Sequence, residues 1–81
     1  MHRALEQTLT NYIVQEFLYG EGEVAADTDL FEERILDSFS FLQLLSFLSE
    51  RWGLEVQMRD ITIDNFRTIE KIAAYTASHT S

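Results

Sequence analysis

Cysteine and proline are both absent from this chain of 81 residues, and only three glycines occur in it. Without cysteine the chain can form neither a disulfide nor a thiolate metal site, and this composition fits a reducing compartment. No apolar run approaches the length of a membrane span, and no basic segment followed by an apolar stretch opens the sequence. We therefore expect a soluble, cytoplasmic protein.

Basic residues are also scarce, since six lysines and arginines stand against fourteen acidic residues and give a formal net charge of −8. A surface of this sign repels the phosphates of nucleic acids and of anionic lipid membranes, so neither is an expected partner. It favours partner proteins with basic surfaces. A simpler interpretation, in which the charge only keeps a small domain in solution, fits the composition equally well.

Hydrophobic residues make up 46% of the chain and aromatic residues 12%, which excludes a disordered protein and indicates one domain over residues 1–81. The apolar spacing is helical almost throughout. A first helix is predicted over residues 3–19, with Gly20 as its C-terminal stop. Its inner face comprises Leu5, Leu9, Tyr12, Ile13 and Phe17. A long loop follows up to residue 37, and the apolar residues expected to anchor its second half are Leu30, Phe31, Ile35 and Leu36.

Three further helices are predicted, over residues 38–52, 62–66 and 68–78, with a short extended link at 54–58. The inward stripe of the helix over 38–52 comprises Phe41, Leu44, Leu45, Leu48 and Trp52. Thr62 and Thr68 are the expected N-caps of the last two helices. The inner face of the final helix comprises Ile69, Ile72, Ala73 and Thr76, and residues 77–81 are expected to fray. The predicted fold class is therefore all-α, a four-helix bundle with a long first loop and a short third helix.

Asp37 and Ser38 stand directly before the apolar run of the second helix. Ser38 is the expected N-cap, and Asp37 adds a favourable charge beside the positive end of the helix dipole. A hydrolytic role for Ser38 is excluded, because the only histidines, His2 and His79, lie near the chain ends and no glycine flanks the serine. The remaining chemical interpretation is that Ser38 is itself modified. A hydroxyl at a helix N-terminus is well placed to carry a phosphodiester, whose charge the dipole and the free N–H groups favour.

Two segments, DTDLFEERILDSF at 27–39 and DITIDNFRTIEKIAAYT at 60–76, give the chain a resemblance to a known family. With this spacing between them, the two segments resemble those of the acyl and peptidyl carrier proteins. The resemblance covers nearly the whole chain. It implies a four-helix carrier bundle and a 4′-phosphopantetheine arm, which a phosphopantetheinyl transferase attaches from coenzyme A to Ser38, next to Asp37. It further implies a carrier and no enzyme activity. An adenylating ligase or acyltransferase loads the arm with a thioester-bound group, which downstream condensing or tailoring enzymes then use.

The sequence departs from the family pattern at three positions near these motifs. Arg34 and Ser40 stand where members often have glycine, and Ile63 replaces a common proline. None of the three changes the attachment chemistry. The second helix carries no acidic residue before Glu50, whereas fatty-acid carriers typically have acidic residues along it. The chain therefore looks more like a free-standing carrier of aminoacyl, peptidyl or specialised acyl groups, as in nonribosomal peptide or polyketide-type synthesis.

Apolar residues outside the inward stripe predict a contact surface beside Ser38. Phe39 lies far around the helical wheel from the stripe, and Leu42 lies at its edge. The expected partner-facing residues are Phe39, Leu42, Gln43 and Ser46. Phe47 is predicted either as a second contact or, with equal weight, as a side chain packed against the first loop.

The main alternative is a helical adaptor that binds a partner through the same face of the second helix and is never modified. Composition and periodicity fit this adaptor as well as they fit a carrier, and a monomer is expected in both cases. A calcium site in residues 27–38 is not expected. Glu32 and Ser38 stand where a calcium-binding loop of this type requires glycine and glutamate.

Overall fold

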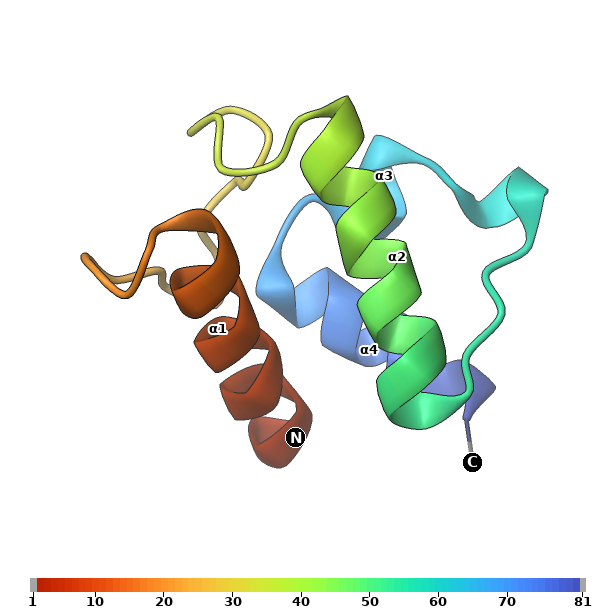
Figure 1. Ribbon diagram of the computed structural model, residues 1–81. Coiled ribbons are helices and arrows are strands. Elements are labelled where there is room, and N and C mark those ends of the chain that lie inside the picture. The colour runs from red at the N-terminus through yellow and green to blue at the C-terminus, as the bar shows by residue number, and fades with distance from the viewer. Residues whose placement is uncertain (1, 81) are drawn as a thin grey trace.

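The computed structural model of the protein describes residues 2–80, in which the regular elements are all helical. The α-helices are α1 (Arg3–Phe17), α2 (Ser38–Trp52), α3 (Ile63–Phe66) and α4 (Ile69–His79), and one turn of 3₁₀-helix, η1 (Met58–Asp60), precedes α3. Helices α1 and α2 run in opposite directions, and α4 lies across the back of this pair (Figure 1). The predicted all-α bundle with a long first loop and a short third helix is confirmed.

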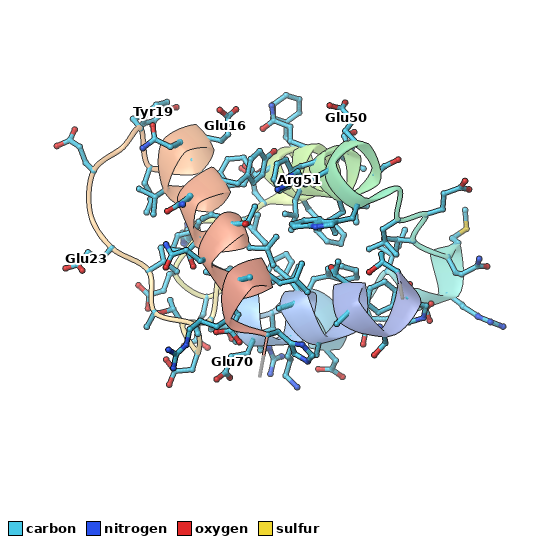
Figure 2. All side chains as sticks on the ribbon, turned by 90° about the horizontal axis from the view of Figure 1, so that it is seen from below. Glu16, Tyr19, Glu23, Glu50, Arg51 and Glu70 are labelled. Atoms are coloured by element: carbon cyan, nitrogen blue, oxygen red, sulfur yellow. The ribbon has the colours of Figure 1, made fainter. Side chains whose placement is uncertain are left out.

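The core lies where the inner faces of α1, α2 and α4 meet, as the side chains in Figure 2 show. The centres of the predicted stripes are fully buried, and their edges are half-buried against the same cluster. The fully buried centres are Leu9 and Ile13 in α1, Leu44 and Leu48 in α2, and Ile69, Ile72, Ala73 and Thr76 in α4. Phe66 of α3 is also fully buried and contacts Phe41 and Tyr75 through aromatic pairs. The 3.6-residue periodicity therefore predicted the buried faces correctly.

The C-terminal end of α1 differs from the prediction, because the helix stops at Phe17 and not at residue 19. The chain turns into the left-handed region at Tyr19 (φ 55°) and Gly20 (φ 80°). The N–H of Gly20 then donates to the carbonyl of Val14 at 2.8 Å, which satisfies a free acceptor at the helix end. The glycine therefore has the predicted stop function, but the left-handed turn already begins at a tyrosine.

The C-terminal end of α4 also differs, because residues 77–79 are helical and do not fray. The ring of His79 stacks on the ring of Tyr75 with 4.1 Å between centroids, and its Nδ1 lies 2.9 Å from the Tyr75 carbonyl. This local contact extends the helix to His79. Residue 81, the last of the segment expected to fray, lies outside the described residues.

The two threonine caps are confirmed. The hydroxyl of Thr62 accepts from the N–H of Asn65 at 3.3 Å, and that of Thr68 accepts from the N–H of Lys71 at 3.1 Å. The turn η1 was not predicted by the sequence. It is held from α4, since the hydroxyl of Tyr75 donates to the carboxylate of Asp60 at 2.8 Å. A side chain fifteen positions away therefore stabilises a turn whose own sequence carries no strong helix signal.

Leu30, whose side chain is fully buried, attaches the second half of the long first loop to the bundle. The N–H of Leu30 donates to the carbonyl of Arg67 at 2.8 Å, which ties the loop to the junction of α3 and α4. The carbonyl of Leu30 accepts from Ile35 at 2.9 Å and from Leu36 at 3.0 Å, just before α2 begins. The predicted anchoring role of the apolar residues in this half of the loop is confirmed, and both backbone groups of Leu30 contribute to it.

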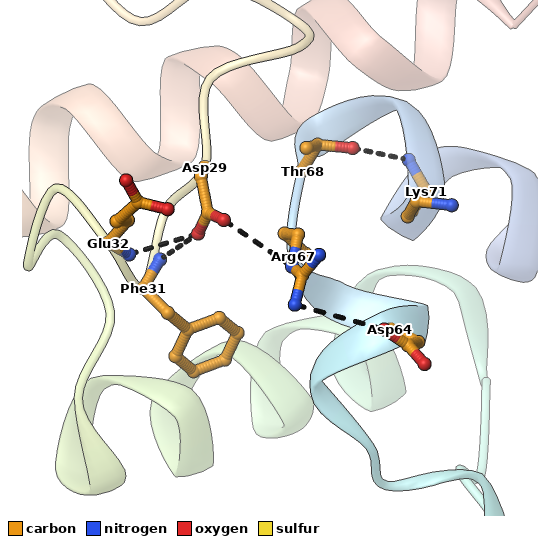
Figure 3. Close-up of polar contacts among 7 residues, drawn as sticks. All are labelled: Asp29, Phe31, Glu32, Asp64, Arg67, Thr68 and Lys71. Atoms are coloured by element: carbon orange, nitrogen blue, oxygen red, sulfur yellow. Dashed lines mark hydrogen bonds and ion pairs between the residues drawn. The ribbon is translucent and has the colours of Figure 1, made fainter.

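A charged contact supports the same junction (Figure 3). One carboxylate oxygen of Asp29 accepts from the N–H groups of Phe31 and Glu32 at 3.1 and 2.9 Å, which fixes the turn after Leu30. The other oxygen lies 3.4 Å from Nε of Arg67. Because this pair is partly exposed, it contributes orientation more than free energy.

We predict that Leu30→Ala lowers the free energy of unfolding by about 2–5 kcal/mol, since it leaves a cavity at the point where the loop meets the core. Leu42→Ala is the matched control, because this leucine is 62% exposed. It should change the free energy by less than about 0.5 kcal/mol. Urea denaturation followed by circular dichroism measures both, and equal losses at the two positions would contradict the assigned core.

Candidate functional site

The N-cap of α2 is Asp37, which corrects the prediction that Ser38 is the cap. Asp37 is the last residue with extended backbone (φ −126°, ψ −170°), and its carboxylate oxygen accepts from the N–H of Ser40 at 2.9 Å. Ser38 is already the first residue of the helix. The exposed Ser38 side chain is consequently not needed to cap the helix, and it stands one residue inside the N-terminus.

Asp37 is held in its ionised form. Hydrogen bonds from the backbone N–H and then from the side chain of Ser40 lower the pKa of its carboxyl below the ordinary value of 3.8. A negative charge therefore sits beside Ser38 at neutral pH, at the end of the helix where the dipole favours it.

The chain reaches this corner through a strained turn. Arg34 has a φ of 62°, in the left-handed region that residues with a side chain rarely adopt. The N–H groups of Arg34 and Ile35 donate to the carbonyls of Phe31 and Leu30 at 3.1 and 2.9 Å, the pair of bonds that closes a turn around a left-handed residue. The strain explains why glycine would suit this position, where the carrier family often has it.

A hollow of about 410 Å³ opens beside Ser38, on the side of α2 that faces α3. Its walls come from three separate segments, and most of them are apolar. The lining residues are Phe31, Asp37, Ser38, Phe41, Ile61, Thr62 and Ile63. Ile61 and Ile63 are substantially exposed, although both are apolar. Ser38, the candidate attachment residue, therefore borders a groove that is polar at Asp37 and Ser38 and mostly apolar elsewhere.

Comparison with known proteins decides the family of this chain. Residues 7–76 match the family described as the phosphopantetheine attachment site. The chain belongs to this family of carrier proteins. The carrier is 35% identical over 71 residues to the "Probable acyl carrier protein PigG" of Serratia sp. (strain ATCC 39006), across 86% of this chain and 82% of the relative. It is 41% identical over 64 residues to the "D-alanyl carrier protein" of Bacillus cereus (strain B4264), across 79% of this chain and 71% of the relative.

A solved structure has a similar fold. A chain from the "Crystal structure of FAD-dependent dehydrogenase" superposes on the carrier with a TM-score of 0.79 and 26% sequence identity. The match covers 84% of this carrier and 97% of that chain, so the two chains are of similar length. The protein is thus a carrier and not an enzyme, its covalent cofactor is 4′-phosphopantetheine, and its general partners are phosphopantetheinyl transferases and ligases or acyltransferases. No helix within residues 2–80 is long and apolar enough to span a bilayer.

The corner at Ser38 suits such an arm chemically. The exposed hydroxyl can form the phosphodiester, and the first N–H groups of α2 favour the phosphate charge. The groove between α2 and α3 offers apolar contact to the methyl and methylene groups of pantetheine, and Thr62 adds a hydroxyl to its wall. The residues present therefore fit the cofactor, and Ser38 would hold it.

The residues predicted to face partners lie as the helical wheel indicated, with one exception. Phe39 and Leu42 are 70% and 62% exposed, and Gln43 and Ser46 are exposed as well. Phe47 is half-buried, and its ring stacks on Tyr12 of α1.

The packing of Phe47 is aromatic. Its ring stacks on Tyr12 with 3.8 Å between centroids and contacts the edge of Trp52 at 5.6 Å. Gln43, Ser46 and Phe47 line a hollow on the side of α2 that faces α1. Ser38, in contrast, lines the hollow on the α3 side, so the predicted site residues divide between the two sides of α2.

Sequence reasoning missed the apolar wall that Ile61 and Ile63 build beside Ser38. A signal was present, because both isoleucines flank a cap residue outside any inward stripe, where exposed apolar side chains are informative. The left-handed backbone of Tyr19 had no comparable signal, whereas Arg34 stands where the carrier family often has glycine.

We predict a pH-dependent contribution of Asp37 to stability. Because its pKa is lowered in the folded state, its charge stabilises the fold above the ordinary value of 3.8, and this contribution is lost as the pH falls through the lower folded value. Asp37→Asn keeps a capping oxygen but removes the charge, so it should be less stable than wild type at pH 7, and the difference should shrink at a pH below 3.8. Thermal melts at both pH values test this, and a gap of constant size would show that the charge is not the cause.

We predict that Arg34→Gly raises the free energy of unfolding by about 1 kcal/mol, because it relieves the left-handed strain. The matched control is Arg34→Ala, which removes the same side chain but keeps a Cβ in the strained conformation. Urea denaturation should show a gain for glycine alone. A similar gain for alanine would locate the effect in the arginine side chain.

Proposed function

We propose that Ser38 carries the 4′-phosphopantetheine arm and that the carrier shuttles an acyl, aminoacyl or peptidyl group between biosynthetic enzymes. The observation that carries this proposal is the position of Ser38. Its exposed hydroxyl lies at the first residue of α2, directly after a cap that does not use it. The other serines of α2 stand further along the helix, at positions 40, 46 and 49. The hydroxyl at the N-terminus is therefore best placed for a phosphodiester.

Attachment requires little of the carrier itself. The Ser38 oxygen forms a bond to the β-phosphorus of coenzyme A, the bond to the adenosine bisphosphate leaving group breaks, and the serine proton passes to a base of the transferase. The carrier presents the hydroxyl on a rigid helix end. Once bound, the arm supplies the thiol that forms thioesters.

We further propose that the cargo is an aminoacyl, peptidyl or specialised acyl group. The D-alanyl carrier protein relative supports an amino acid, and the acyl carrier protein relative supports an acyl derivative. The absence of acidic residues in α2 before Glu50 gives its front a different charge from that of a fatty-acid carrier. A pathway of the nonribosomal peptide type, acting in the cytoplasm, fits these features.

The proposed partners are the enzymes that attach the arm, load it and use its cargo. They are a phosphopantetheinyl transferase, an adenylating ligase or acyltransferase, and downstream condensing or tailoring enzymes. Because one similar chain belongs to the "Crystal structure of FAD-dependent dehydrogenase", a flavin dehydrogenase is a candidate tailoring enzyme. The exposed residues Phe39 and Leu42, with Gln43, Ser46 and the half-buried Phe47, are the proposed partner-facing side of α2.

We predict that incubation with coenzyme A and a broad-specificity phosphopantetheinyl transferase adds one phosphopantetheinyl group per chain. Ser38→Ala should abolish this mass increase without lowering the melting temperature, because the cap of α2 is Asp37. Ser49→Ala, an exposed serine of α2 outside the proposed partner-facing residues, is the matched control and should be modified normally. Intact-protein mass spectrometry gives the result. A wild-type chain that takes up no arm, under conditions that modify a known carrier, would favour the unmodified adaptor.

A further inference from the structure

A second groove runs along the side of α2 that faces α1, and it shares only Asp37 with the hollow at Ser38. Two hollows that share Gln43 form it, with volumes of about 250 and 380 Å³. We call it the α1–α2 groove. The residues used to define it are Tyr12, Glu16, Tyr19, Phe39, Gln43 and Glu50. Figure 2 shows Tyr19, Glu16 and Glu50 along one edge of the molecule, with Glu70 at the opposite edge.

One end of the α1–α2 groove is bordered by two exposed aromatic rings. Tyr19, just after α1, is 86% exposed, and Phe39, in the first turn of α2, is 70% exposed. Both line the same hollow. Aromatic side chains exposed beside a concave surface are typical anchors of protein interfaces.

The middle of the α1–α2 groove carries negative charge. The pKa of Tyr12 is raised, first by burial and then by the charges of Glu16 and Glu50, so both carboxylates act on the floor of the groove. Neither forms an ion pair within residues 2–80, where the ion pairs present are those of Arg67.

Two cations stand near the α1–α2 groove and do not neutralise its centre. The guanidinium of Arg51 lies over the ring of Trp52, 5.4 Å from its centroid. Arg34 lines the end of the groove beside Asp37, away from Glu50. The groove thus combines an aromatic end with unpaired carboxylates, and its charge complements a basic side chain.

We propose that the α1–α2 groove docks the enzyme that loads the arm, through a lysine or arginine placed between Glu16 and Glu50 and an apolar side chain held by Tyr19 and Phe39. This inference rests on the proposed function, because it names the surface that the adenylating ligase recognises. The net charge of −8 attracts a basic partner in general, and the groove gives that attraction a fixed position. The ligase then contacts the α1 side of α2, while the Ser38 side stays open for the arm.

The test is the loading of holo-protein by a purified adenylating ligase, chosen from a panel of amino-acid ligases because it loads the wild-type carrier. Glu16→Gln combined with Glu50→Gln keeps the shape of the groove and removes two charges. We expect the KM for the carrier to rise about tenfold with little change in kcat. The salt dependence of KM should weaken in parallel, because fewer charges then steer the encounter. Arm attachment by the transferase should be unchanged.

The matched control is Glu23→Gln combined with Glu70→Gln, which removes the same charge from exposed sites outside the groove. It should leave KM within about twofold of wild type. Equal effects of the two pairs would overturn the proposal, since net charge alone would explain them. No effect of either pair would overturn it as well.

A third variant separates docking from folding. Tyr19→Gly removes the aromatic ring and suits the left-handed backbone at φ 55°, so the melting temperature should stay the same or rise. Loading efficiency, kcat/KM, should still fall about tenfold. Normal loading by this variant would remove the aromatic end from the docking surface. A wild-type chain that accepts no arm would instead refute the proposed function, and this inference would fall with it.

Discussion

The position of the whole functional corner depends on the backbone of Leu30. Its N–H binds the junction of α3 and α4, and its carbonyl binds the two residues that lead into Asp37. A loop of this length would otherwise have many conformations, and ordering it costs about 1–2 kcal/mol per residue in backbone entropy. The buried Leu30 side chain offsets part of that cost at one point. The start of α2 is therefore fixed by contacts with the last third of the chain.

Helix α2 separates two surfaces of different chemistry. On the α3 side, apolar walls surround the hollow at Ser38, and Ile61 and Ile63 supply much of them. On the α1 side, Gln43, Ser46 and Glu50 line a hollow together with Phe47, whose ring stacks on Tyr12. A single helix can carry both surfaces because residues three or four positions apart share a face. The two faces that flank the buried stripe can therefore differ in polarity. A carrier that must hold an arm and also meet several enzymes benefits from this division.

Much of the fold was predictable because it follows from local chemistry. The spacing of Leu9 and Ile13 placed the inner face of α1, and Thr62 and Thr68 marked two helix starts correctly. The cap of α2 was assigned one residue too late, because Asp37 and Ser38 are both good capping residues. Their roles are decided by where the backbone leaves the extended region, and the loop contacts at Leu30 determine that point.

The parts of the candidate site that could not be predicted depend on distant segments or on strain. The wall at Ile61 and Ile63 reaches Ser38 only through the packing of α3, which no local pattern describes. Tyr19 and Arg34 adopt positive φ values although neither is glycine, so the residue types point away from the observed turns. The groove between α1 and α2 combines residues that are about thirty positions apart, such as Tyr12 and Gln43, whose contact at 3.2 Å exists only in the folded chain.

The aromatic stack under the α1–α2 groove also gives the carrier a built-in optical reporter. Trp52 is the only tryptophan of the chain, and it contacts Phe47, whose ring lies on Tyr12. Light absorbed by tyrosine or tryptophan in this molecule is therefore emitted mainly from one indole at the base of two helices. Any event that moves α1 against α2, or changes the polarity around their contact, should alter the emission wavelength of that indole. The protein can thus report on its own encounters in solution without an attached dye.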